Sequence, residues 1–146
     1  MLTRRNMNIY LAGPLFSEAE RAWLTALKRQ IEENGRGVMV IWPWELFSQG
    51  EIESLGCDAP KEIFRRCRDA LDRCDTVVAL LDGPMVDDGT AWEIGYAYAR
   101  RKRIIGIRTD LRRAGECEGS CTNAMIEHAC EHVVKSTAEL LEVLFL

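Results

Sequence analysis

The sequence contains no long hydrophobic run, because no apolar stretch in its 146 residues approaches the ~18 that a membrane-spanning helix needs. The first five residues also lack the apolar segment of a signal peptide. We therefore expect a cytoplasmic protein with no membrane partner. A net charge of −4 and a pI near 5.3 provide no broad basic surface, which argues against a nucleic acid polymer as partner.

Common cofactor and metal motifs are missing as well. No G-x-G-x-x-G follows the first predicted strand and no G-x-x-x-x-G-K-[ST] occurs, so a dinucleotide or P-loop nucleotide lacks its usual cradle. The six cysteines include no C-x-x-C pair, and zinc at Cys117 and Cys121 would need ligands from later in the chain. Cys67 and Cys74 share a helical face and are expected to act as small core hydrophobes. We predict neither a metal nor a cofactor.

Short apolar runs rich in β-branched residues alternate with helical patterns. Five strands are predicted, over 8–12, 38–42, 76–81, 103–107 and 132–134. Five helices are predicted, from the capping box at Ser17 to Asn34, over 61–74, from Thr90 to about 101, over 124–130, and from Ser136 onward. The segment 44–60 has no clean period, and we expect it to be a long loop near the ligand.

This alternation indicates a parallel sheet with right-handed crossovers and helices on both faces. We predict a flavodoxin-like (Rossmann-like) three-layer α/β sandwich with strand order 2-1-3-4-5, in a single domain over 1–146. Its ligand crevice lies between strands one and three, so the loops 13–17 and 82–89 should line the pocket. These loops offer carboxylates and aromatics, which suit a neutral, hydroxyl-bearing ligand with a flat ring better than a polyphosphate.

The stretch after the third strand carries the candidate chemistry. Asp87 and Asp88 precede Thr90, the predicted N-cap of the next helix. Thr90 and Glu93 have the spacing of a capping box, in which Glu93 only reaches back to a backbone N–H, and this is the more frequent situation for such spacing. The alternative is a carboxylate at the ligand edge, kept ionised by the helix dipole and able to attack a sugar carbon.

These segments resemble the nucleoside 2-deoxyribosyltransferase family. The resemblance is carried, in order and over nearly the whole chain, by Ile9-Tyr-Leu-Ala-Gly-Pro-Leu-Phe16, Asp87-Asp-Gly-Thr-Ala-Trp-Glu-Ile-Gly-Tyr-Ala97 and Asn123-Ala-Met125. It implies an enzyme of nucleotide salvage that transfers 2-deoxyribose between the bases of 2′-deoxynucleosides, with slow hydrolysis when no acceptor base is present. Its partners would be a small-molecule deoxynucleoside, a free nucleobase and further copies of the chain, in a homodimer or larger homo-oligomer with shared active sites.

The resemblance also implies roles for individual residues. Glu93 would be the nucleophile that attacks C1′ and forms a covalent glycosyl-glutamate, and Asp87 would handle the proton of the base. Tyr10 would help to position the nucleophile or the sugar, and Asn123 would reach the sugar 5′-hydroxyl in the pocket of an adjacent chain. The remaining substrate-binding residues, which would line the pocket, are Gly13, Phe16 and Gly89.

Some positions depart from the family pattern. A further carboxylate on the helix before the third strand falls at Cys67 when counted back from Asp75, and Asp69 fits only with a shift of register, so neither is included in the site. Trp44 and Phe47 could stack on a base or could be structural.

Two other functions stay open. One is an N-glycosidase that hydrolyses 2′-deoxynucleoside 5′-monophosphates with the same fold and glutamate. The other is a non-catalytic nucleoside-binding domain in which Glu93 is only a cap. The sequence leaves the choice between purine and pyrimidine bases open.

Overall fold

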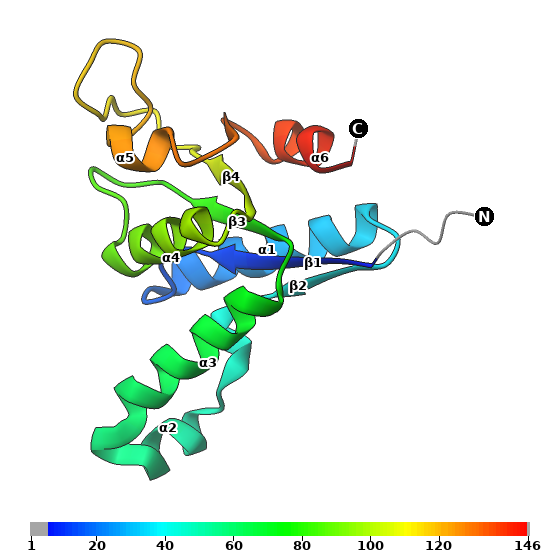
Figure 1. The fold of residues 1–146 in the computed structure, drawn as a ribbon, viewed down its shortest axis with the longest axis vertical. Helices are drawn as coiled ribbons and strands as arrows, with labels where there is room; N and C mark the ends of the chain where they lie inside the picture. Colours follow the sequence, from blue (N-terminus) through cyan, green and yellow to red (C-terminus); the bar gives the residue numbers. More distant parts are fainter. Residues whose placement is uncertain (1–5, 146) are drawn as a thin grey trace.

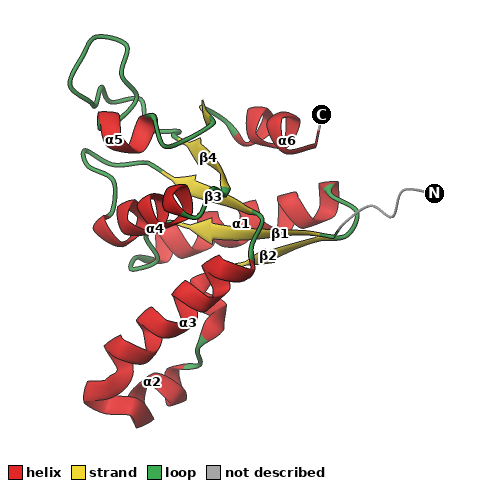
Figure 2. Ribbon diagram, in the orientation of Figure 1, coloured by secondary structure: helices red, strands yellow, loops and turns green. Residues whose placement is uncertain are grey.

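The computed structural model describes residues 6–145, and residues 1–5 and 146 lie outside this description. Its middle layer is a five-stranded parallel sheet in the order β2-β1-β3-β4-β5 (Figure 1, Figure 2). The strands are β1 (Met7–Ala12), β2 (Val38–Ile41), β3 (Thr76–Leu80), β4 (Arg103–Ile107) and β5 (His132–Val134). The predicted flavodoxin-like fold and strand order are confirmed.

Two hydrophobic cores lie on opposite faces of the sheet, because successive side chains of a strand point to opposite sides. Ile9 and Leu11 pack into the core under α1 (Glu18–Asn34) and α6 (Thr137–Phe145). Tyr10 and Ala12 pack into the core under α3 (Ala59–Arg73) and α4 (Asp88–Ala99). All four of these β1 residues are completely buried. The sheet is therefore covered on both faces, as its continuous apolar strands predict.

The capping box predicted at the start of α1 is present. The Ser17 hydroxyl accepts the N–H of Glu20 at 3.2 Å, and the Glu20 carboxylate accepts the N–H groups of Ser17 at 2.8 Å and Phe16 at 3.0 Å. The loop that follows β1 is thereby fixed, and the N–H groups of Phe16, Ser17 and Glu20 are already used.

The segment 44–60 is helical, so the prediction of a long loop is wrong. It contains the 3-10 turn η1 (Pro43–Leu46), the helix α2 (Gln49–Leu55) and a second 3-10 turn, η2 (Gly56–Asp58). A capping box between Ser48 and Glu51 starts α2 in spite of the mixed polarity of the segment. Arg66 of α3 ties this segment down, since its guanidinium donates to the Leu46 carbonyl at 2.9 Å.

The boundaries of α3 and α5 also differ from the prediction. α3 begins at Ala59, two residues early, and α5 (Ala124–Glu127) ends three residues before the predicted end. The chain turns after α5 because the N–H of Glu131 pairs with the Ile104 carbonyl at 2.8 Å and starts β5 beside β4. Within residues 6–145, no helix is long and apolar enough to cross a membrane.

Candidate active site

A cavity of about 470 Å³ opens where β1 and β3 end, at the crevice predicted for this strand order. Its lining comes from the loop after β1, from η1 and α2, from one face of α3 and from the start of α4. The lining residues are Gly13, Leu15, Phe16, Pro43, Trp44, Phe47, Gln49, Ile52, Ile63, Cys67, Asp87, Gly89 and Glu93. Apart from one amide and two carboxylates, the wall is apolar, which suits a flat ring with few charges.

Asp87, and not Thr90, caps α4. Its carboxylate Oδ2 accepts the N–H of Thr90 at 2.9 Å and the Thr90 hydroxyl at 3.0 Å. The N-cap therefore lies three residues earlier than predicted, and α4 starts at Asp88. The Thr90 side chain is buried, and its hydroxyl donates to the Asp87 carboxylate instead of capping the helix itself. These bonds fix the Asp87 carboxylate at the helix start, beside the cavity.

Glu93 does not form the capping box. Its Oε2 atom is buried and has no hydrogen-bond partner within residues 6–145, while the side chain lines the cavity. Burial raises the pKa of Glu93 to about 7; the nearby Tyr10 hydroxyl opposes this shift and the Asp87 charge adds to it. Burial thus opposes the ionisation that the helix dipole is expected to favour, and the ionised state of Glu93 stays a prediction.

Tyr10 lies behind Glu93 on β1. Its ring is fully buried, and its hydroxyl has no partner that satisfies hydrogen-bond geometry among the described residues. Burial, followed by the negative charge of Glu93, raises the pKa of Tyr10 far above its usual range, with Cys67 also close to the hydroxyl. The hydroxyl thus stays protonated and can donate its proton to a neighbouring acceptor.

Cys67 occupies the site from the α3 side, whereas Asp69 does not. The Cys67 side chain is half-buried and lines the cavity with Glu93. The Asp69 carboxylate pairs with Arg65 and Arg68, each at 2.9 Å, and is not part of the cavity wall. Counting back from Asp75 without a shift therefore identifies the residue of α3 that faces the site, which is Cys67. The expectation that Cys67 is only a core residue is wrong, because its side chain lines the cavity.

The predicted pocket residues Gly13, Phe16 and Gly89 all line the cavity. A Cβ atom at Gly13 would lie 3.2 Å from the Cβ atom of Leu80, and one at Gly89 would lie 3.3 Å from Oδ2 of Asp87. Side chains there would crowd β3 and the cap of α4. The Phe16 ring is 74% exposed at the mouth.

Asn123 lies apart from the other predicted site residues. It caps α5 by accepting the N–H of Met125 at 3.0 Å, and its amide donates to Glu116 at 2.7 Å. It lines a separate hollow of about 370 Å³ beside Met85 and Val86. A single chain thus brings five of the seven predicted residues to the cavity wall, with Tyr10 buried behind Glu93, and the delivery of Asn123 by a neighbouring chain stays a prediction.

The segment 44–60, which was predicted to lie near the ligand, does form part of the cavity wall, although its residues were not assigned to the site. Trp44 and Phe47, left open between two roles, both line it, and Gln49 and Ile52 join them from α2. The Arg21 guanidinium lies 4.8 Å from the centre of the Trp44 ring, which holds that ring in place. The Ser48-x-x-Glu51 spacing was the available signal for this wall.

A second unpredicted feature is the anchoring of the loop that carries Asp87. The buried Arg108 donates to the carbonyls of Leu81 at 2.6 Å and Gly83 at 3.0 Å. Asp82 accepts the N–H of Thr109 at 2.6 Å. These bonds join the loops after β3 and β4 and keep Asp87 in place. A lone arginine after an apolar strand carries no signal of this role in the sequence.

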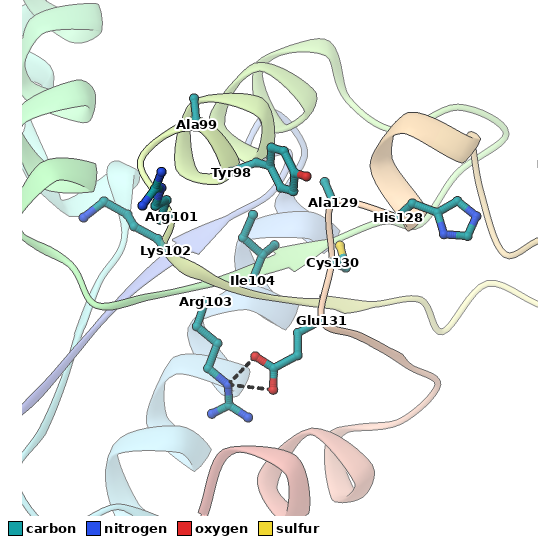
Figure 3. Close-up of a pocket in the computed structure, with 10 residues that line it drawn as sticks. All are labelled: Tyr98, Ala99, Arg101, Lys102, Arg103, Ile104, His128, Ala129, Cys130 and Glu131. Atoms are coloured by element: carbon teal, nitrogen blue, oxygen red, sulfur yellow. Dashed lines mark hydrogen bonds and ion pairs between the residues drawn. The ribbon is translucent and has the colours of Figure 1, made fainter.

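A larger hollow of about 610 Å³ lies at the opposite edge of the sheet, where β4 begins (Figure 3). Two of the cations on its wall are engaged: Lys102 donates to the Cys74 carbonyl at 2.6 Å, and Arg103 pairs with Glu131 at 3.2 Å. It holds no pair of carboxylates, so we assign the chemistry to the smaller cavity. No group of three or more His, Cys, Asp or Glu side chains in the described chain is arranged to hold a metal ion.

Glu93 should make the fold less stable as the pH rises from about 5 to 7. Its pKa is about 7 in the folded state against 4.5 ordinarily, so the folded state binds more protons between these values. The free energy of unfolding should then fall with rising pH, by at most about 3 kcal/mol. We expect Glu93→Gln to remove this decline in urea denaturation at a series of pH values. Asp88→Asn, at the same helix end, should keep it; an unchanged decline in Glu93→Gln would contradict the assignment.

Comparison with solved structures gives chains of the same fold. A conserved protein of Enterococcus faecalis V583 superposes with a TM-score of 0.78 at 30% identity, covering 93% of this chain and 95% of that one. The 2-deoxyribosyltransferase of Bacillus psychrosaccharolyticus gives 0.75 at 22% identity, covering 92% and 90%. The CMP N-glycosidase BcmB of Clostridium botulinum gives 0.60 at 23% identity, covering 95% and 99%.

Two curated relatives are uncharacterised proteins. UU063 of Ureaplasma parvum is 33% identical over 147 aligned positions, covering 91% of each chain. C191.05c of Schizosaccharomyces pombe is 32% identical over 108 residues, which cover 71% of this chain and 51% of the relative. The aligned part thus spans about half the length of the yeast protein.

A family profile also matches the sequence directly. The profile of the nucleoside 2-deoxyribosyltransferases matches residues 9–125, which include Tyr10, Asp87, Glu93 and Asn123. The match covers most of the chain, from β1 to α5. This chain belongs to the nucleoside 2-deoxyribosyltransferase family.

Proposed function

We propose that the protein transfers 2-deoxyribose between the bases of 2′-deoxynucleosides through a covalent intermediate on Glu93. Family membership indicates an enzyme of the deoxyribosyltransferase or N-glycosidase type that acts on small nucleosides and bases. One observation supports the finer assignment: Glu93 has a buried carboxylate oxygen without a partner in residues 6–145, on the wall of the cavity that also holds Asp87.

The first half of the reaction forms the glycosyl-enzyme. The ionised Glu93 carboxylate attacks C1′ while the N-glycosidic bond breaks, and the base leaves with the bonding electrons and takes a proton from Asp87. The sugar passes through an oxocarbenium-like state, whose positive charge an adjacent carboxylate stabilises. Tyr10 would donate a hydrogen bond to the ionised Glu93 carboxylate during the reaction and so orient it.

The second half reverses these steps with a different base. An incoming base attacks C1′, releases the Glu93 carboxylate and returns a proton to Asp87. Two displacements at one carbon restore the original anomer. Water can attack in place of the base, which gives slow hydrolysis.

The remaining residues would hold the substrate. The rings of Trp44 and Phe47 offer flat apolar surfaces for a base. Gly13 and Gly89 leave room at the floor, and Phe16 covers the mouth. Asn123 would come from a neighbouring copy and reach the 5′-hydroxyl, so that the active sites are completed in a homo-oligomer.

The charges of the cavity favour a free nucleoside over a 5′-monophosphate. The carboxyl groups of its wall belong to Asp87 and Glu93, and none of the residues that line it is Lys, Arg or His. The N–H groups of Phe16 and Ser17 donate to Glu20, so they offer no cradle for phosphate. Hydrolysis of 2′-deoxynucleoside 5′-monophosphates is therefore the second candidate.

A non-catalytic domain in which Glu93 serves only as a helix cap is disfavoured, because the residue that caps α4 is Asp87.

Incubation with deoxyinosine and free adenine tests the proposal. We expect deoxyadenosine and hypoxanthine to appear together, measured by liquid chromatography, because the acceptor base intercepts the glycosyl-enzyme. Without adenine, hypoxanthine should be released more slowly, by hydrolysis. Base release from a 2′-deoxynucleoside 5′-monophosphate with no transfer to adenine would favour the hydrolase instead. No reaction with either substrate would favour a non-catalytic domain.

A further inference from the structure

The loop between β4 and α5 (yellow to orange in Figure 1) holds Asn123 through a carboxylate of its own. One oxygen of Glu116 accepts the Asn123 amide N–H at 2.7 Å, and the other accepts the N–H of Ala124 at 3.0 Å. The Asn123 amide oxygen in turn accepts the N–H of Met125 at 3.0 Å. The orientation of the amide is thus set at both ends. Since an amide has two N–H groups and two oxygen lone pairs, one of each can still bind a ligand hydroxyl.

The backbone around Glu116 is closely packed, so this carboxylate has a defined place in the loop. Gly115 has a φ of +91°, in the left-handed region that favours glycine, and a Cβ atom there would lie 2.5 Å from the Thr122 carbonyl oxygen. Further along the loop, Glu127 accepts the N–H of Cys121 at 3.0 Å. These contacts close the loop on itself and set Glu116 against the start of α5.

The surface around Asn123 carries a negative charge and no compensating cation. Asn123 lines the hollow of about 370 Å³ beside Met85, and Glu116 is the only charged side chain among the described residues of its wall. A phosphate group bound to the Asn123 amide would therefore lie close to the Glu116 carboxylate, which holds the same amide at 2.7 Å. Like charges repel there, whereas a neutral hydroxyl meets no such repulsion.

We propose that Glu116 is a specificity-determining residue of the reaction: it orients the Asn123 amide for the 5′-hydroxyl of a free 2′-deoxynucleoside and repels the 5′-phosphate of a nucleotide. This inference rests on the proposed function, in which Asn123 of a neighbouring copy reaches the 5′ end of the sugar. It adds a selecting charge at that end to the carboxyl groups around C1′.

Binding without turnover tests the role of the charge. In a Glu93→Gln background, which leaves the nucleoside intact, isothermal titration calorimetry gives Kd for deoxyinosine and for deoxyinosine 5′-monophosphate. We expect Glu116→Gln to tighten monophosphate binding about tenfold, since the new amide can still accept the Asn123 N–H but carries no charge. Kd for deoxyinosine should change by less than about twofold, so the ratio of the two Kd values falls.

The matched control is Glu118→Gln, because Glu118 is an exposed carboxylate of the same loop that does not line the hollow beside Asn123. It should leave the ratio unchanged. Raising NaCl from about 0.05 to about 0.5 M should lower the ratio when Glu116 is present and change it less in Glu116→Gln, because salt screens charges. An unchanged ratio in Glu116→Gln, an equal effect of Glu118→Gln, or tighter binding of the monophosphate than of the nucleoside with Glu116 present would overturn the proposal.

The second test measures the orienting role through the 5′-hydroxyl itself. Transfer to adenine is compared between deoxyinosine and 2′,5′-dideoxyinosine, which lacks that hydroxyl. Glu116→Ala loses both hydrogen bonds, so the preference in kcat/KM for deoxyinosine should fall about fivefold, whereas Glu116→Gln should keep most of it. In an Asn123→Ala background, Glu116→Ala should have no further effect on this preference. An unchanged preference in Glu116→Ala, or a further fall in the double variant, would overturn the orienting role.

The two tests separate this inference from the proposed function. If the unaltered protein transfers no deoxyribose, the proposed function fails, and the ratio of the Kd values still decides whether Glu116 repels a 5′-phosphate. If transfer occurs and neither the ratio nor the preference responds to Glu116, only the role of Glu116 fails.

Discussion

Replacing Glu93 by Gln should lower kcat for deoxyribosyl transfer by at least about a thousandfold, since the amide cannot form the glycosyl ester. The fold should survive, because Glu93 makes no capping bond and one of its oxygens is buried without a partner within residues 6–145. At pH 7.5 we expect a free energy of unfolding no lower than that of the unaltered protein. Steady-state kinetics and urea denaturation measure the two effects.

The control for this variant is Asp88→Asn, an exposed carboxylate in the first turn of the same helix. It should keep activity, because Asp88 is not part of the cavity wall. Activity of Glu93→Gln within tenfold of the unaltered protein would show that the reaction needs another nucleophile.

Replacing Asp87 by Asn should lower kcat by about a hundredfold or more, because an amide cannot exchange a proton with the base. Stability should change little, since Asn is as good an N-cap as Asp and can still accept the N–H of Thr90. Asp87→Ala should lose the same activity and about 1 kcal/mol of unfolding free energy as well, because the cap is lost.

The pair of variants separates the two roles of Asp87. Parallel chemical denaturation and kinetics on Asp87→Asn and Asp87→Ala provide the comparison. If Asp87→Asn retained full activity while Asp87→Ala lost it, Asp87 would serve only as the cap of α4, and another group would have to protonate the base.

The sheet was predictable because its signals are local. Runs such as Thr76–Leu80 are apolar and β-branched throughout, as strands buried on both faces must be, and the alternation with helices restricts the strand order. The position of Asp87 and Glu93 at the pocket follows from the same logic, because they come just after the end of β3, beside the switch point of the sheet.

The start of α4 was not predictable from spacing. Asp87 and Thr90 are both residue types that are favourable at an N-cap, so the spacing alone does not decide which of them is the cap. Asp87 is the N-cap because the Thr90 side chain is buried, and its buried hydroxyl needs a hydrogen-bond acceptor, which the Asp87 carboxylate provides. The same choice frees Glu93 for the cavity.

The burial of Glu93 depends on residues that are distant in sequence. Its pKa is raised mainly by burial, in a cavity whose wall includes Trp44 from η1 and Ile63 from α3. The placement of Asn123 is a similar case, because a long loop separates it from β4 and the sequence does not determine where that loop leads. No local sequence pattern predicts the burial of Glu93 or the position of Asn123.

The central claim is that Glu93 becomes bonded to the sugar. Rapid acid quenching during turnover of a deoxynucleoside, followed by mass spectrometry of the protein and its peptides, tests this most directly. We expect a fraction of the protein to gain the mass of one deoxyribosyl group, on the peptide that contains Glu93, and to lose it when free adenine is added. An adduct on a different residue, or base release at full rate with no adduct at any time, would contradict the account.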